Sequence, residues 1–139
     1  MRHTMTRLYV HLVWATWNRA PLITADIEQR VYAVMQHQAS RLGAEVIAIG
    51  GVEDHVHVLA RFPATLAIAE LVGKMKGASS HFTAQILGET FKWQGGYAAF
   101  TVSRSALPTA RAYVLNQKAH HRDGTAHRAL EPEPVRLRG

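Results

Sequence analysis

Apolar and polar residues alternate in four stretches of the chain, which predicts four β-strands. Residues 6–15 show the pattern most clearly, with Leu8, Val10, Leu12 and Trp14 on one face. The same alternation recurs at residues 44–49, 52–60 and 97–102. Gly50 and Gly51 separate the second stretch from the third. They therefore predict the turn of an antiparallel hairpin.

A spacing of apolar residues near 3.6 predicts three helices around these strands. The first starts near Thr24, which fits an N-cap position, and ends at Gly43. The second covers residues 65–87, and the third covers residues 109–121 with Pro108 in its first turn. The order β-α-β-β-α-β-α suits an α+β, ferredoxin-like (RRM-like) sandwich. Its antiparallel four-stranded sheet would carry the first two helices on one face, and the third helix would be an addition to this two-layer arrangement.

The sheet face away from the first two helices carries candidate chemistry. It bears Tyr9, His11, His55 and His57, and the third helix is the obvious candidate to cover it. Two imidazoles two residues apart on one strand face can converge on a metal ion. An isolated His-x-His pair is, however, more often simply solvated.

The third helix offers two further groups. Tyr113 and Gln117 are four residues apart and so share one helical face. If that face meets the sheet, the Gln117 amide oxygen can join a metal held by His55 and His57, with Tyr113 a turn away. From spacing alone, an amphipathic core or surface position for Tyr113 is the more common explanation.

Length and composition limit the architecture. A chain of 139 residues with 47% hydrophobic content predicts a single domain, residues 1–139, and a soluble protein. We expect an ordered core at about residues 6–121 and a tail at residues 122–139, where Glu-Pro-Glu-Pro interrupts any periodicity. No apolar run approaches the ~18 residues of a membrane span, so we expect no membrane association and a cytoplasmic location. The absence of cysteine excludes disulfides, thiolate ligands and cysteine nucleophiles.

The charge favours a polyanionic partner, most simply nucleic acid. Sixteen Lys and Arg against ten Asp and Glu give a net charge of +6, and the basic residues are dispersed along the chain. The candidate phosphate contacts are Arg19, Lys74, Lys76, Lys92 and Arg104. The candidate stacking residues for unpaired bases are Trp17 and Trp93. Lysines on a helix are commonly just solvated, and either tryptophan could belong to the core.

Four segments together carry a resemblance to a known family. They are residues 51–59 (GVEDHVHVL), 74–80 (KMKGASS), 93–97 (WQGGY) and 113–122 (YVLNQKAHHR). In this order they resemble the single-tyrosine HUH transposases, the small enzymes of insertion sequences that move as single-stranded DNA. Relatives of these enzymes are associated with repetitive extragenic palindromes. The resemblance runs from Tyr9 to Arg122.

The resemblance implies a site and a reaction. His55 and His57 match the metal-binding pair, Gln117 the third protein ligand and Tyr113 the nucleophile. Family members use Mg²⁺ or Mn²⁺ to cleave single-stranded DNA near a hairpin, leaving a 5′-phosphotyrosine and a free 3′-OH. They act as homodimers, and in some the tyrosine helix completes the partner subunit's site. This chain departs from some relatives in becoming Gly- and Pro-containing soon after Arg122, which leaves docking in cis or in trans open.

Several alternatives remain open from the sequence. His120 and His121 could reach the metal or the substrate, although surface positions are expected for them. A domesticated relative that binds or nicks a chromosomal repeat would share the same residues. A non-catalytic RNA-binding domain of this fold should carry aromatic rings where the histidines lie. A two-histidine phosphoesterase is matched only nominally, by His3-Thr4 and by His81 with Thr83.

Overall fold

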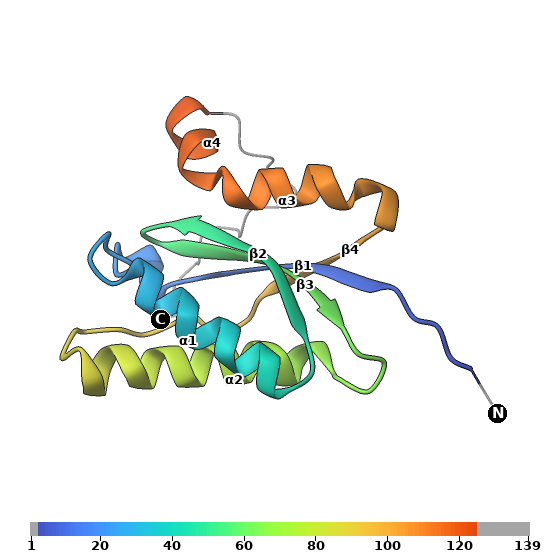
Figure 1. The fold of residues 1–139 in the computed structure, drawn as a ribbon. Coiled ribbons are helices and arrows are strands. Elements are labelled where there is room, and N and C mark those ends of the chain that lie inside the picture. Colours follow the sequence, from blue (N-terminus) through green and yellow to red (C-terminus); the bar gives the residue numbers. More distant parts are fainter. Residues whose placement is uncertain (1–2, 125–139) are drawn as a thin grey trace.

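The computed structural model describes residues 3–124 and contains an antiparallel four-stranded sheet between two layers of helices (Figure 1). The strand order is β2-β3-β1-β4. The strands are β1 (Leu8–Ala15), β2 (Glu45–Val52), β3 (His55–Phe62) and β4 (Ala98–Val102). The helices are α1 (Glu28–Arg41), α2 (Ile68–His81), α3 (Leu107–Leu115) and α4 (Gln117–Asp123). Short helical turns cover Trp17–Arg19, Phe82–Ile86 and Arg104–Ala106. This confirms the predicted α+β fold with a four-stranded antiparallel sheet and an additional C-terminal helix.

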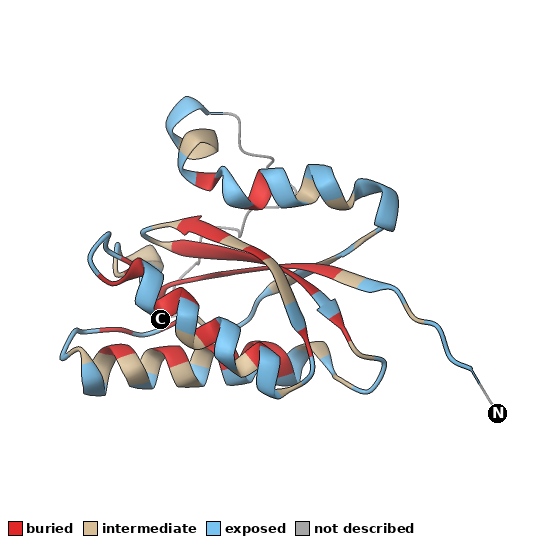
Figure 2. Cartoon of the chain, viewed as in Figure 1, coloured by how far each residue is buried: buried red, intermediate tan, exposed pale blue. Residues whose placement is uncertain are grey.

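The main hydrophobic core lies between the sheet and the α1–α2 layer (Figure 2). Alternation along β3 points Val56, Val58 and Ala60 into this core, on the face opposite to His55 and His57. A smaller apolar cluster of Ala48, Leu59 and Val114 lies on the opposite face, beneath α3. The two faces of the sheet therefore differ in chemistry as well as in what covers them.

The β2–β3 hairpin differs from the prediction, because Gly50 and Gly51 do not form its turn. Both belong to β2, where Gly50 pairs with His57, and the turn is formed by Glu53 and Asp54. A Cβ atom at Gly50 would lie 2.1 Å from the carbonyl oxygen of Val114 on α3. The glycine is required by the close approach of a helix to the strand and not by a turn conformation.

Each predicted helix differs in extent from the observed one. α2 begins at Ile68 and ends at His81, and the rest of the predicted 65–87 continues as the separate turn Phe82–Ile86. α1 begins at Glu28, because residues 24–27 form turns in which the Thr24 carbonyl accepts from Ile27 N and Glu28 N. The predicted single third helix is divided at Asn116, whose backbone is non-helical (φ −103°, ψ 26°). The Asn116 side chain donates to the Ala112 carbonyl at 2.8 Å, competing with the helical pattern. The predicted tail beyond residue 124 lies outside the described residues.

Within the described residues, no helix is both long and apolar enough to cross a membrane.

Candidate metal and tyrosine site

His55 and His57 project from β3 toward the layer formed by α3 and α4, and both are fully buried. His121, on α4, brings a third imidazole to them. One ring nitrogen from each of the three histidines lies within 4.8 Å of the others. Imidazole nitrogens converging at this spacing can hold a divalent transition metal ion. His121, expected at the surface, is instead partly buried in the site.

Gln117, one turn before His121 on α4, carries a buried side-chain amide. Its side chain is 1% exposed, and its Nε2 donates to the Tyr113 carbonyl at 2.9 Å. Its Oε1 is buried and accepts no hydrogen bond from any described residue. A buried amide oxygen without a partner is costly, and a cation would satisfy it. Since Gln117 and His121 are one turn apart on α4, the donor set fits a divalent metal ion.

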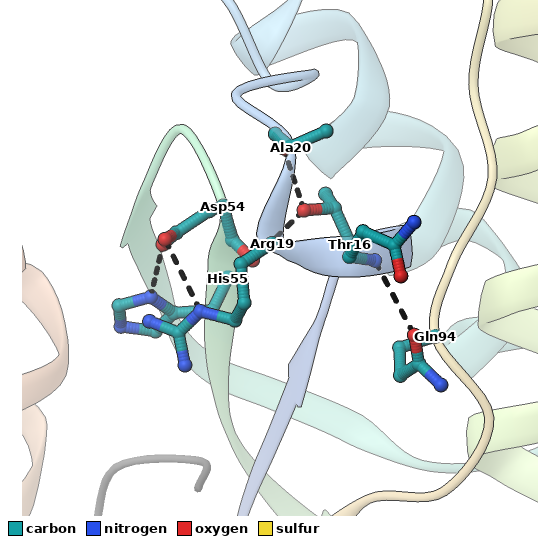
Figure 3. Close-up of polar contacts among 7 residues, drawn as sticks. Thr16, Arg19, Ala20, Asp54, His55 and Gln94 are labelled. Carbon is teal, nitrogen blue, oxygen red and sulfur yellow. Dashed lines mark hydrogen bonds and ion pairs between the residues drawn. The ribbon is translucent and has the colours of Figure 1, made fainter. Parts of the chain in front are cut away.

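Asp54 orients His55 from the β2–β3 turn. Its Oδ1 accepts from His55 Nδ1 at 2.8 Å, and its Oδ2 accepts from Arg19 Nε at 3.1 Å (Figure 3). Burial raises the pKa of Asp54, but the contacts with His55 and Arg19 outweigh it and hold the pKa below its usual value. A carboxylate on Nδ1 leaves Nε2 of His55 as the nitrogen available for a metal.

The loop that carries Arg19 is shaped by left-handed backbone. Asn18 and Arg19 both have φ 54°. The Thr16 hydroxyl donates to the Ala20 carbonyl at 2.6 Å, and Asn18 N donates to Gln94 Oε1 at 3.3 Å (Figure 3). These contacts fix the loop, so that Arg19 meets Asp54 from the end of β1.

Tyr113 lies beside the histidines, on the buried side of α3. Its ring centroid is 5.7 Å from that of His57, 6.2 Å from that of His11 and 4.7 Å from that of His120. It also lines a cavity of about 510 Å³ between β4 and α3, together with His11 and Phe100. The Tyr113 side chain therefore contacts His57 and also lines this cavity.

The predicted nucleic-acid contacts fall into two groups. Trp93 is 7% exposed, and its Nε1 donates to Ser79 Oγ at 2.9 Å, so it belongs to the core and not to a stacking surface. Lys76 Nζ donates to the carbonyls of Gln94 and Gly96, and burial lowers its pKa. These two residues hold the loop before β4 in place.

The remaining predicted contacts are more accessible. Trp17 is 39% exposed, and Lys92 Nζ lies 4.0 Å from the centroid of its ring. Arg19 keeps part of its side chain exposed beside Asp54, while Lys74 and Arg104 are exposed. Arg104 also shares the lining of a small cavity with two other arginines, Arg7 and Arg61.

Two contributors to the site were not predicted, His11 as a contact of His57 and Asp54 as a contact of His55. His11 Nε2 lies 2.7 Å from His57 Nδ1, and both side chains are buried. Alternation had placed both histidines on the same face, but their contact depends on the register of β1 against β3. The signal for Asp54 was its place directly before His55, at the end of a hairpin.

Comparisons with known proteins agree on one family. Residues 4–117 match the family model described as "Transposase IS200 like". The ISDra2 transposase TnpA of Deinococcus radiodurans is 27% identical over 119 residues, which cover 80% of this chain and 84% of that protein. A crystal structure from D. radiodurans, described as that of a transposase, matches with a TM-score of 0.66 and 26% identity, covering 84% of this chain and 95% of that one. A REP-associated tyrosine transposase bound to a REP hairpin shares the fold, with a TM-score of 0.66 and 12% identity over 91% of this chain and 74% of the other.

Proposed function

Because the chain belongs to the family of IS200-like transposases, we propose that it cleaves and rejoins single-stranded DNA with Tyr113 as its nucleophile. The observation that carries this proposal is the convergence of Tyr113, the imidazole cluster and the buried Gln117 Oε1 on one side of the sheet. A tyrosine beside groups that could hold a metal ion is one arrangement that can carry out phosphodiester transfer to a phenol.

In the proposed reaction, Tyr113 Oη attacks the scissile phosphorus. The new oxygen–phosphorus bond forms as the bond from phosphorus to the 3′ oxygen breaks, the phenol loses its proton, and the 3′ oxygen takes one up. The products are a 5′-phosphotyrosine and a free 3′-OH. Attack by another 3′-OH reverses these steps and joins strands without ATP, because the phosphotyrosine ester retains the energy of the phosphodiester.

The main chemical difficulty of this reaction is that a neutral phenol is a poor nucleophile. With a pKa near 10, ionising a tyrosine at pH 7 costs about 4 kcal/mol. A bound Mg²⁺ or Mn²⁺ would offset this by polarising the phosphate and orienting its oxygens. We propose that His55, His57 and Gln117 hold this ion, with His121 within reach as a further ligand. Packing of α3 against β2, through Val114 and Gly50, holds Tyr113 beside them.

We further propose a DNA hairpin as the substrate and a homodimer as the working form. The REP-associated relative is bound to a REP hairpin, and the net charge of +6 suits such a ligand. The exposed Lys74, Lys92, Arg104 and Trp17 would contribute phosphate and base contacts. The contacts of α3 with β2 and β3 of its own sheet support docking of the tyrosine helix in cis, so that each subunit of the dimer would carry its own site.

The test is formation of a covalent adduct. Single-stranded DNA from both flanks of the gene is incubated with protein and Mg²⁺ or Mn²⁺, and the products are separated on a denaturing gel. We expect a protein–DNA adduct that requires metal and disappears in Tyr113→Phe, with hairpin binding retained. Tyr97→Phe, which changes an exposed tyrosine outside the site, is the matched control.

Three other outcomes of the adduct test would each lead to a different conclusion. An equal amount of adduct with Tyr113→Phe would reject the assignment of the nucleophile. Specific hairpin binding without any adduct would favour a domesticated binding protein. The absence of both adduct and DNA binding would favour the RNA-binding alternative.

A further inference from the structure

His11 is a buried histidine next to the proposed metal ligands, and the reaction described above gives it no role. Its side chain is 2% exposed on β1, and its Nε2 lies 2.7 Å from Nδ1 of His57 on β3. In the β1–β3 register His11 is opposite Leu59 and His57 is opposite Val13, so the two imidazoles are diagonal neighbours on one face. His11 thus contacts a ligand without belonging to the cluster of three ligand nitrogens.

We propose that His11 is a positioning residue that fixes the tautomer and orientation of His57 for metal binding. This inference rests on the proposed function, because it assigns His57 to the metal. Nδ1 of His57 faces His11, so Nε2 is the nitrogen left for a metal ion. A neutral imidazole that offers Nε2 as a lone pair must carry its proton on Nδ1. That proton needs an acceptor, and His11 Nε2 is at hydrogen-bond distance.

The assignment also determines the state of His11. Two N–H groups cannot face each other across 2.7 Å, so His11 must accept at Nε2 and carry its own proton on Nδ1. Its ring lies against Tyr113 and Phe100, with centroids 6.2 and 6.1 Å away, and these contacts restrict its rotation. The tautomer of each ring in the pair therefore depends on the other.

His55 is held in the same way as His57, but by a carboxylate and not by an imidazole. Asp54 Oδ1 accepts from His55 Nδ1 at 2.8 Å, while His57 is supported by a neutral ring. Both proposed imidazole ligands then present Nε2 to the ion, each held by a residue from a separate element. Such partners hold the ligands without touching the metal, and removing one typically lowers metal affinity by about 10–100-fold.

A purely structural role for His11 leads to a different expectation. His11→Leu fills the space with an apolar side chain but leaves the His57 Nδ1–H without an acceptor. His11→Gln keeps an acceptor, because its amide oxygen can reach a position close to that of Nε2. If His11 only fills space, both variants should bind metal like the wild type once they are folded.

The first experiment measures the binding of Mn²⁺ alone to the full chain, without DNA, by isothermal titration calorimetry. We expect Kd to rise by about 10–100-fold in His11→Leu and to be largely restored in His11→Gln. His37→Leu, which removes an exposed histidine on α1, is the control and should match the wild type. Wild-type affinity in His11→Leu, or equally weak binding by both His11 variants, would overturn the proposal.

The second experiment needs no variant and no metal. Nitrogen-15 NMR of the metal-free wild-type chain reports which ring nitrogen of each histidine carries the proton. We expect Nδ1–H on both His57 and His11, and an Nε2–H form of His57 would overturn the proposal. Neither measurement uses DNA, so a failure of the Tyr113 adduct test would reject the transposase reaction without changing either result.

Discussion

The Nε2 amide of Gln117 donates to the main-chain carbonyl of Tyr113 at 2.9 Å, across the break that divides α3 from α4. One side chain therefore joins the helical segment of the proposed nucleophile to that of the proposed metal ligand. The Oε1 of the same amide is buried and accepts no hydrogen bond from the described residues. The relative position of Tyr113 and the ion would depend on this short connection.

Gln117→Leu should weaken Mn²⁺ binding at least tenfold while leaving the fold intact. The substitution removes a proposed ligand oxygen. It also removes both a hydrogen bond and an unsatisfied buried acceptor, so we expect the free energy of unfolding to change by only about 1 kcal/mol. Calorimetric titration with Mn²⁺ and urea unfolding measure the two effects, with Gln36→Leu at an exposed position of α1 as the matched control. Wild-type affinity in Gln117→Leu would remove this residue from the ligand set.

Gly50→Ala should destabilise the chain by about 2 kcal/mol or more, because the new Cβ would overlap the Val114 carbonyl and push α3 away from β2. Gly77→Ala on α2 is the matched control. Its Cβ meets nothing within 4 Å, and a helical alanine should add roughly 0.5–1 kcal/mol. Urea unfolding of both variants tests the contrast. Equal stability of the two proteins would show that α3 does not pack closely on β2.

The two tryptophans predicted to stack on bases should respond in opposite ways. Trp93→Ala should cost about 3–5 kcal/mol of folding stability, because it empties a buried site and removes the hydrogen bond to Ser79. Trp17→Ala should leave stability nearly unchanged and weaken single-stranded DNA binding by about 1–3 kcal/mol. Thermal unfolding and fluorescence anisotropy measure these effects. Undiminished DNA affinity in Trp17→Ala would exclude this ring from the binding surface.

Tyr32 should make the chain less stable at alkaline pH. Burial, the negative charge of Glu28 and the hydrogen bond to its carboxylate raise the pKa of Tyr32 well above 10. The folded state thus holds the phenol proton more tightly, so this contribution to stability is complete below pH 10. It is lost as the pH rises above 10, by at most about 1.4 kcal/mol per pH unit.

Tyr32→Phe should therefore show a shallower loss of stability above pH 10 than the wild type. Urea unfolding at a series of pH values from 8 to 11 measures the slope. Tyr97→Phe, which removes an exposed phenol, is the matched control. Identical slopes for Tyr32→Phe and the wild type would show that Tyr32 does not hold its proton more tightly in the folded state than in the unfolded state.

The sequence predicted the fold class because periodicity is a local property. Alternation located the four strands and placed His55 and His57 on the face away from the first two helices, and the structure agrees. The error at Gly50 has a non-local cause, because Val114, whose carbonyl requires a glycine there, lies 64 residues further along the chain. The division of the third helix at Asn116 was also missed, since residues 109–121 keep an acceptable helical pattern through it.

The candidate site was predictable in part. Strand alternation placed His55 and His57 on one face of the sheet, and the four-residue spacing placed Tyr113 and Gln117 on one face of a helix. That this helical face meets the sheet was a condition of the prediction and did not follow from either pattern. The inclusion of His121 depends on the path of α4 after the break. The contact of His11 with His57 depends on the register of two strands that are distant in sequence. Those features are set by tertiary packing, which a single sequence does not specify.

The sheet has its main apolar core on one face and its buried histidines on the other. This division determines whether substitutions that inactivate the protein also unfold it. Imidazoles are costly to bury, so replacing them with aliphatic residues would cost little stability, although it would remove the proposed metal ligands. The core between the sheet and the α1–α2 layer would be unchanged, because it lies on the opposite face. Loss of activity would then bring no loss of folding, and selection against unfolded protein would not eliminate inactive copies. Under the proposed function, lineages that have ceased to cut DNA should persist as stable proteins, available for recruitment to other tasks.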